Sequence, residues 1–146
     1  MITLHPVSFN NTEDFSGTSY DAMSRDEKVQ MIDESAREAH GGAYFQMLAV
    51  YEDENVVGFT NLFAHSSHII SIGPEIKEHL RGKGYGYLAP IQTLEYAQNR
   101  GYSIAVAQVR EDNAASIALH EKCGFEIDTH CLSRHGKPIR IYIKRL

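Results

Sequence analysis

Residues 81–86 read Arg-Gly-Lys-Gly-Tyr-Gly and lie between a segment with strand-like apolar spacing and one with helix-like spacing. Glycine permits positive φ, so successive backbone N–H groups can converge on one point where the helix begins. A plain glycine-rich turn is the alternative, but it would not need two cationic side chains at the same mouth. We therefore expect a pyrophosphate to be bound by Arg81, Gly82, Lys83, Gly84, Tyr85 and Gly86.

A second segment, residues 113–125, reads Asn-Ala-Ala-Ser-Ile-Ala-Leu-His-Glu-Lys-Cys-Gly-Phe. This pattern predicts a short helix with Asn113 as its N-cap and Gly124 as the residue that ends it. Asn113 and His120 are seven residues apart, which is two helical turns, so both should face the same side.

Together the two segments resemble the GNAT superfamily of acyl-CoA N-acyltransferases. The cofactor loop of that family follows an Arg/Gln-x-x-Gly-x-Gly/Ala pattern, matched here by Arg81, Gly84 and Gly86. The second segment is similar to the family's Asn…Leu-Tyr-Glu-Lys-x-Gly-Phe stretch, with His120 where many members carry Tyr. The resemblance is specific over about residues 67–127 and implies an acyltransferase that uses acetyl-CoA as acyl donor.

The resemblance also implies how the cofactor is held. Family members separate the strand before the loop from the strand after its helix, and the pantetheine arm lies in that gap. The corresponding strands here are residues 68–76 and 103–110, so backbone at Ile76 and Glu78 and the side chain of Asn113 are the expected partners of the arm. Pro74 has no N–H with which to polarise the thioester carbonyl, so a neighbour must do so.

The reaction implied is direct attack by an amine on the thioester. By resemblance His120 replaces the tyrosine that protonates the departing sulfur, and an imidazole can do so near neutral pH. The alternative is that Asn113 is only a helix cap and His120 a surface residue. For the general base, a count back from Arg81 points to His68, Glu75 lies nearer the loop, and a water relay is a third choice.

Composition excludes several classes of protein. The chain has 146 residues with 42% hydrophobic content, which suits one domain over residues 1–146. A formal charge of −5 argues against a nucleic-acid partner, and no apolar run could span a membrane. Two cysteines and no signal peptide favour reduced thiols in the cytoplasm. Histidines 65, 68 and 79 lack the spacing of a metal site.

The expected fold is an α/β domain with a mixed, mostly antiparallel sheet flanked by helices. The apolar pattern predicts strands at residues 1–7, 43–51, 56–64, 68–76, 103–110, 125–132 and 139–146, and helices within 20–40, from the glycine loop to about 100, and at 113–125. Residues 8–20 read as loop. The stripes expected to be buried are Ala22, Val29, Ile32 and Ala36 in the first helical region and Tyr87, Leu88, Ile91, Leu94 and Ala97 in the second. Pro90 predicts a kink or a later helix start, and residues 103–110 a strand buried on both faces.

The acceptor side is expected at the helical region 20–42, the 52–55 turn and the basic 133–137 hairpin. The first two are net negative, which would attract a cationic amine on a small molecule or a protein. A catalytically silent acyl-CoA-binding module is the alternative function, and the sequence leaves a homodimer open. A Rossmann-type nucleotide enzyme is disfavoured, because the glycines have the wrong spacing and no acidic ribose partner follows them.

Overall fold

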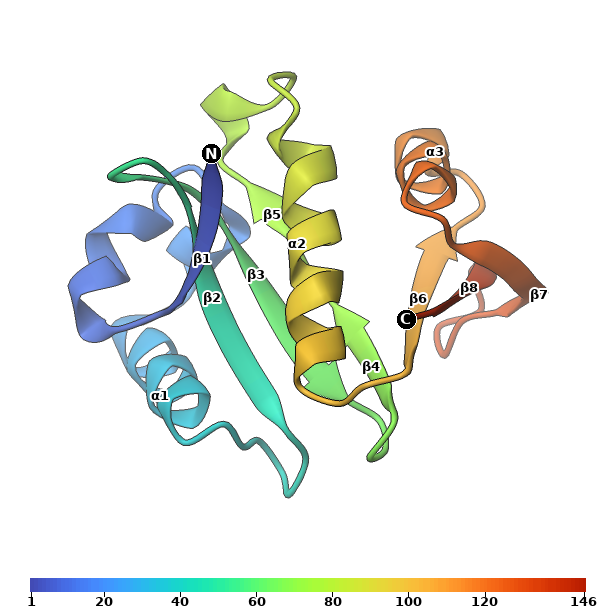
Figure 1. The fold of residues 1–146 in the computed structure, drawn as a ribbon, viewed down its shortest axis with the longest axis horizontal. Helices are drawn as coiled ribbons and strands as arrows, with labels where there is room; N and C mark the ends of the chain where they lie inside the picture. The colour runs from blue at the N-terminus through green and yellow to red at the C-terminus, as the bar shows by residue number, and fades with distance from the viewer.

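The computed structural model describes residues 1–146 and contains one eight-stranded sheet (Figure 1). The strand order is β1-β2-β3-β4-β6-β8-β7, with β5 paired to β3 beyond β4. Every pairing is antiparallel except the one between β4 and β6, which is parallel. The predicted mixed, mostly antiparallel α/β fold is therefore confirmed.

The elements come in the predicted order, but the single strand predicted at residues 68–76 is divided into β4 and β5 at Gly73 and Pro74. The strands are β1 (Ile2–Pro6), β2 (Phe45–Glu52), β3 (Asn55–Ala64), β4 (Ile69–Ile72), β5 (Glu75–Ile76), β6 (Ile104–Arg110), β7 (Glu126–Leu132) and β8 (Pro138–Arg145). The helices are α1 (Arg25–Ala36), α2 (Tyr85–Asn99) and α3 (Ala114–Lys122), with short 3₁₀ helices η1 (Phe9–Phe15), η2 (Ser19–Ala22) and η3 (Glu78–Leu80).

The segment before α1 is not the loop that its polar composition predicts. Residues 8–20 contain η1 and the start of η2, and Ser8 closes a capping box with Asn11. Phe15 is fully buried and packs against Phe59 at a ring distance of 4.8 Å. The contact of one aromatic side chain holds this segment on the sheet, and no periodic pattern of apolar residues is needed.

The predicted buried stripe of α1 is mostly wrong. Of its members only Ile32 is buried, and Val29 is 39% exposed. Ser35 is the second buried residue of α1, because its hydroxyl oxygen accepts from the N–H of Met47 and its O–H donates to the Met47 carbonyl. A polar residue that bonds to a strand backbone is invisible to a hydrophobic pattern.

Helices α1 and α2 cover opposite faces of the sheet (Figure 1). Met47 packs with Phe15 and Ile32 on the α1 face, whereas its neighbour Leu48 packs with Leu94 of α2. The alternation of strand side chains separates these two clusters. We call the two sides the α1 face and the α2 face.

Helix α2 begins at Tyr85 and continues through Pro90, so the later start is wrong. Leu88 was expected on the buried stripe but is 44% exposed. The buried residues are instead Ala89, Pro90, Thr93, Leu94 and Ala97. The stripe is rotated because the proline ring itself packs inward.

The parallel ladder between β4 and β6 is short. It joins Ile69 to Ile104 and Ile70 to Ala105, and beyond these pairs the two strands separate. Figure 1 shows β6, β8 and β7 turned away from the rest of the sheet, with α2 and α3 on either side of the opening. The separation predicted between these strands is present.

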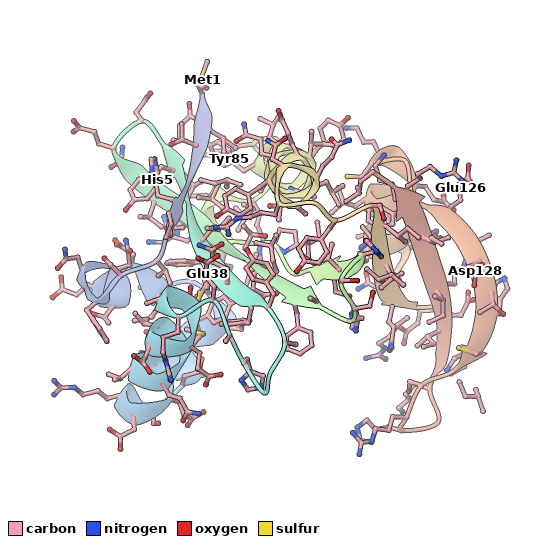
Figure 2. The ribbon with its side chains drawn as sticks, turned by 60° about the horizontal axis from the view of Figure 1, so that its bottom comes forward. Met1, His5, Glu38, Tyr85, Glu126 and Asp128 are labelled. Atoms are coloured by element: carbon pink, nitrogen blue, oxygen red, sulfur yellow. The ribbon has the colours of Figure 1, made fainter.

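The C-terminal strands are less covered than their sequences suggest. In β6 only Ala105 and Val109 are buried, so the prediction of burial on both faces is wrong. Strand β7 is the edge strand and every residue in it is exposed. In Figure 2 its residues Glu126 and Asp128 lie at the opposite end of the sheet from Met1 and His5 of the other edge.

We predict that Phe15→Ala destabilises the protein by ~3–5 kcal/mol, because it empties a fully buried aromatic site. Phe9→Ala, in the same 3₁₀ helix, should cost less than about 0.5 kcal/mol, since Phe9 is 55% exposed. Guanidinium unfolding of both variants measures the difference. Equal losses would show that Phe15 does not anchor this segment.

Candidate active site

The gap between β4 and β6 encloses a cavity of about 300 Å³. Its walls come from the two separated strands, from Pro90 of α2, and from one face of α3. The residues that line it are Ser71, Ile72, Gly73, Pro74, Pro90, Val106, Ala107, Gln108, Ser116, Leu119, His120, Cys123 and Phe125. The four from α3 follow the i, i+3, i+4, i+7 spacing of one helix face.

The glycine loop lies at the N-terminus of α2 and is built to receive an anion. Gly84 is the N-cap residue with φ 91°, and Gly82 has φ 80°. The N–H groups of residues 82–86 have no acceptor in the protein. A Cβ atom at Gly82, Gly84 or Gly86 would meet nothing within 4 Å, so open space lies in front of these donors. Five free N–H groups facing open space fit a pyrophosphate.

Two cations lie at this loop without a carboxylate partner. The Nε–H of Arg81 donates to the carbonyl of Ile76 at 3.2 Å, which holds the guanidinium beside the end of β5. Lys83 is exposed, and neither residue is part of an ion pair. Both charges are therefore available to a phosphate.

Backbone pairing decides which donors face the gap. Gly73 exchanges two hydrogen bonds with Asn61 of β3, at 2.9 and 3.3 Å, so its polar groups face β3. By alternation the N–H of Ile72 faces the gap. The predicted arm partners differ: the carbonyl of Ile76 accepts from Arg81, and the N–H of Glu78 donates to the carbonyl of Gly17 at 2.9 Å. Ile72 therefore offers a free N–H to the gap two residues before Pro74, which has none.

His120 lines the cavity from the last turn of α3. Its Nδ1 lies 2.7 Å from the carbonyl oxygen of Ser116 and must carry a hydrogen to bond it. The second ring nitrogen, Nε2, then accepts a hydrogen bond in the neutral ring and donates one in the imidazolium. Proton donation by His120 into the cavity therefore needs the charged form.

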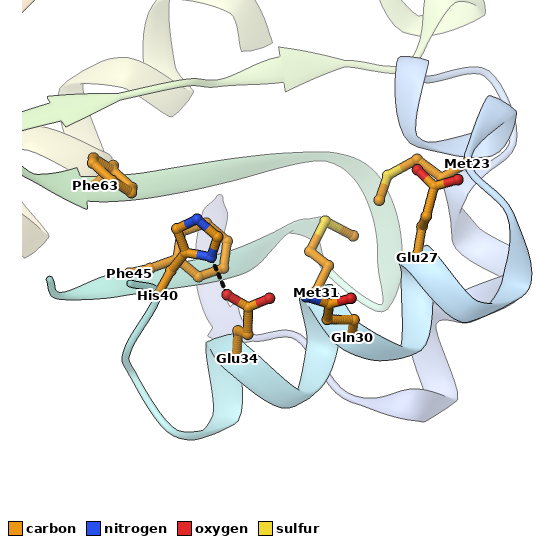
Figure 3. Close-up of a pocket in the computed structure, with 8 residues that line it drawn as sticks. All are labelled: Met23, Glu27, Gln30, Met31, Glu34, His40, Phe45 and Phe63. Carbon is orange, nitrogen blue, oxygen red and sulfur yellow. Dashed lines mark hydrogen bonds and ion pairs between the residues drawn. The ribbon is translucent and has the colours of Figure 1, made fainter. Parts of the chain in front are cut away.

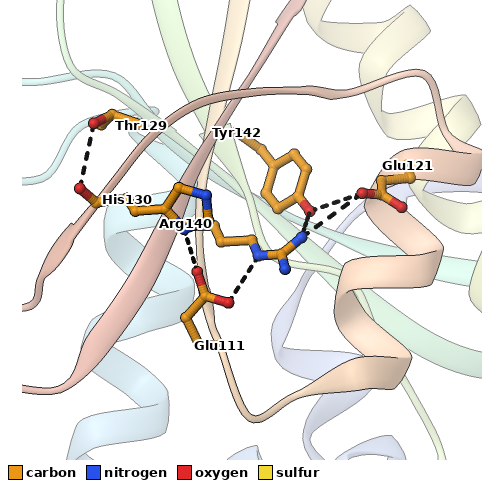
Figure 4. A network of polar contacts seen from close by, with 6 residues as sticks. All are labelled: Glu111, Glu121, Thr129, His130, Arg140 and Tyr142. Atoms are coloured by element: carbon orange, nitrogen blue, oxygen red, sulfur yellow. Dashed lines mark hydrogen bonds and ion pairs between the residues drawn. The ribbon is translucent and has the colours of Figure 1, made fainter.

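Figure 4 shows a polar network around the hydroxyl group of Tyr142. The ring of Tyr142 is fully buried and stacks on His120 at 5.9 Å. The Tyr142 hydroxyl accepts from Arg140 at 3.1 Å and donates to Glu121 at 3.2 Å, and Arg140 also binds Glu111. The bond from Arg140, with a second one from His130, lowers the pKa of Glu111. These contacts fix the plane on which the imidazole rests.

The structure also shows the hydrogen bonding of Asn113 and the burial of Cys123. Asn113 is the N-cap of α3 as predicted; its Oδ1 accepts from the N–H of Ser116 at 3.1 Å, which leaves its amide N–H₂ free. Cys123 is buried in the cavity wall, and burial raises the pKa of its thiol. Both Cys123 and Cys131 are free cysteines.

The two predicted bases lie outside the cavity wall. His68 is exposed and precedes β4 at the closed end of the gap. Glu75 follows the lining residue Pro74, but its carboxylate accepts from both the N–H and the hydroxyl of Ser19. Of the three predicted catalytic residues, His120 therefore lines the cavity, and His68 and Glu75 do not.

A second cavity of about 350 Å³ lies on the α1 face (Figure 3). It is lined by Met23, Glu27, Gln30, Met31, Glu34, His40, Phe45 and Phe63. Glu34 hydrogen-bonds His40, and this bond lowers the pKa of the carboxyl group. A cavity with two carboxylates, two methionines and two phenylalanines suits a cation carried on an apolar stem.

No group of three His, Cys, Asp or Glu side chains is placed to hold a metal ion. None of the helices is both long and apolar enough to cross a membrane.

Comparisons with known proteins agree with this geometry. The model of the acetyltransferase (GNAT) family matches residues 9–125. An L-methionine sulfoximine/L-methionine sulfone acetyltransferase of Pseudomonas aeruginosa is 36% identical over 70 residues, which are 48% of this chain and 37% of that protein. A mycothiol acetyltransferase of Rhodococcus opacus is 25% identical over 92 residues, 56% of this chain and 29% of that protein. The chain therefore spans well under half of the length of these relatives.

Solved structures share the fold across nearly the whole chain. Spermidine N-acetyltransferase from Vibrio cholerae, in complex with CoA and spermine, superposes with a TM-score of 0.82 at 14% identity and covers 99% of this chain and 95% of its own. Ribosomal-protein-alanine N-acetyltransferase from Brucella melitensis gives 0.81 at 20% identity and covers 99% of both chains.

We predict that Gly84→Val abolishes binding of acetyl-CoA, with affinity reduced at least ~10²-fold or about 2.7 kcal/mol. The new side chain would fill the space in front of the N–H groups. Gly101→Val is the matched control at the other end of α2, where φ is 97° and the space is also open. Both variants carry the same backbone strain, but calorimetry should show unchanged affinity in the control. Full affinity in a folded Gly84→Val protein would refute the phosphate loop.

Proposed function

The chain belongs to the GNAT acetyltransferase family, and on that premise we propose that it transfers an acetyl group from acetyl-CoA to a primary amine. Two observations carry this proposal: the cavity between β4 and β6, whose wall includes Pro90 of α2, and the five unpaired N–H groups at the start of the same helix. The loop suits the pyrophosphate, and the cavity suits the arm that carries the thioester.

We assign the contacts to the cofactor from the donors that are free. The loop from Gly82 to Gly86, with Arg81 and Lys83, would bind the phosphates. The N–H of Ile72 would bind a carbonyl oxygen in the gap, and the free amide of Asn113 would bind the arm while its oxygen caps α3. When bound, acetyl-CoA supplies the acetyl group as an activated thioester.

Direct attack by the amine is favoured over an acyl-enzyme. Cys123 is the cysteine in the cavity wall, and its raised pKa keeps it a thiol at neutral pH, whereas thiolate is the nucleophile. The amine must therefore react with the thioester itself. His120 would protonate the departing sulfur as an imidazolium, with Nε2 as the donor.

The acceptor is best placed in the cavity on the α1 face. Glu34 is 13% exposed and ionised, and Glu27 lies on the same face of α1, two helical turns earlier. A second positive charge on the acceptor would pair with these carboxylates while the apolar side chains contact its stem. Relatives named for spermidine, for a ribosomal protein and for methionine sulfone all act on amines, which supports an amine acceptor. A cytoplasmic location and a homodimer stay predictions.

The function is tested by release of CoA thiol with a panel of L-methionine sulfone, spermidine and a peptide with an N-terminal alanine. At least one amine should release thiol in proportion to acetylated product. With a dicationic acceptor, Glu34→Gln should raise KM about tenfold, because it removes a charge-assisted contact. Asp26→Asn removes the same charge from the exposed side of α1 and should leave KM unchanged.

Thiol release with none of these amines, despite tight acetyl-CoA binding, would favour the silent acyl-CoA-binding module. Equal effects of the two variants would place the acceptor elsewhere.

We predict that His120→Phe lowers kcat by about 10²-fold or more, the usual size of a general-acid contribution, with little change in acetyl-CoA affinity. His120→Tyr should keep activity, because a phenol supplies the proton from the same position. Steady-state kinetics and calorimetry of both variants provide the measurement. A Phe variant that turns over as fast as wild type would exclude His120 as the acid.

A further inference from the structure

Ser71 marks the point where the β4–β6 ladder ends. The last backbone pair joins Ile70 to Ala105, and at the next position the Ser71 hydroxyl donates to the carbonyl of Val106 at 3.1 Å. A side chain thus replaces the backbone bond as the strands part. Ser71 also lines the cavity, so its hydroxyl lies at the closed end of the gap.

His65 binds the same hydroxyl. Its Nε2 lies 2.6 Å from the oxygen of Ser71, and its ring meets Phe63 edge-on at 5.8 Å. Phe63 is the cross-strand partner of Ser71, so the three side chains share one face of the sheet. Phe63 also lines the acceptor cavity and lies 6.0 Å from His40, which places this group on the α1 face.

Resting on the proposed function, we propose that Ser71 and His65 form the proton relay that deprotonates the attacking amine. Ser71 touches the substrate nitrogen, and His65 acts through it. Ser71 lines the cavity in the gap, and His65 contacts Phe63 of the cavity on the α1 face. His120 instead packs on Phe125 and Tyr142 in the α2-face cluster. Base and acid therefore approach the thioester from opposite faces of the sheet.

The step balances in protons and electron pairs. The Ser71 hydroxyl first turns from the Val106 carbonyl to the unprotonated Nε2 of His65, 2.6 Å away. The substrate ammonium then gives one proton to the Ser71 oxygen while the Ser71 proton passes to Nε2. The freed lone pair attacks the thioester carbon, the C–S bond breaks, and His120 gives a proton to the sulfur. As the amide forms, the nitrogen passes its second proton to His120, which becomes an imidazolium again. His65 is exposed and returns its proton to water, so one proton is released per turnover.

The charged group beside the hollow of His65 is Arg100, whose guanidinium lies over the Tyr44 ring at 5.6 Å and makes no contact with His65. Tyr44 and Tyr102 line this hollow with His65, and burial raises the pKa of both phenols, so they stay neutral. His68 follows in the same turn, and His40 lies across the Phe63 ring. No carboxylate forms an ion pair with His65.

This assignment differs from both bases expected from the sequence. His68 is three residues further along, is exposed, and lines neither cavity. Glu75 already accepts two hydrogen bonds from Ser19. Ser71 touches the cavity and His65 touches Ser71, which is the continuity that a relay needs.

The test uses pH profiles of kcat/KM with whichever amine of the panel reacts fastest. His65→Gln should lower kcat/KM at neutral pH by about 10²-fold and remove the ascending limb, while acetyl-CoA affinity stays unchanged. Ser71→Ala should act similarly, and the double variant should be no slower than either single one, because the pair works as a unit. Ser71→Thr should restore activity. His5→Gln, an exposed histidine on β1, is the control and should leave the profile unchanged.

Three outcomes overturn the relay alone, and the first two are a His65→Gln enzyme that keeps the ascending limb and a His68→Gln enzyme that loses it. Additive losses in the double variant would also overturn it, since a merely structural pair need not act in one step. A wild-type protein that releases no thiol with any amine overturns the proposed function and the relay together.

Discussion

The site depends on one constraint: the parallel ladder of β4 and β6 stops after two pairs. The strands are connected through α2, so their carboxyl ends and the N-terminus of α2 lie at the same end of the sheet. Separation at that end leaves the N–H of Ile72 without a strand partner and opens the cavity at the same end of the sheet as the free donors of residues 82–86. A continued ladder would satisfy the backbone, but it would remove the cavity.

The separated strands also keep the two proton transfers apart. His120 reaches the gap from α3, where Tyr142 and its ion-paired neighbours hold the ring. The Ser71 hydroxyl reaches it from the other face, where β4 still follows the register of β3. An acid and a base in direct contact would exchange a proton with each other. Ser71 and His120 line the same cavity from opposite faces of the sheet and share no hydrogen bond, so each can hold the charge state that its step requires.

Local rules predicted part of this site, and tertiary contacts supplied the rest. Gly84 and Asn113 follow from turn and cap chemistry, which depends on neighbouring residues alone. Phe15 and Ser35 anchor their segments through single contacts with β3 and β2, and no periodic pattern reports such contacts. The choice between His65 and His68 depends on how the β3–β4 turn closes onto Ser71. That closure is a property of strand register, and counting residues back from Arg81 does not reveal it.

Charge distribution explains how a chain with net charge −5 can bind a polyanion. Arg81 and Lys83 stand at the mouth of the phosphate loop, and Lys122 lies over the Tyr87 ring at 4.4 Å, on the first turn of α2. Glu27 and Glu34 line the cavity on the α1 face. The two regions lie on opposite faces of the sheet, and salt largely screens exposed charges from one another beyond about 8 Å at physiological ionic strength. The cofactor and a cationic acceptor can then each bind in a local field of opposite sign, so the net charge of the chain does not determine the binding of either.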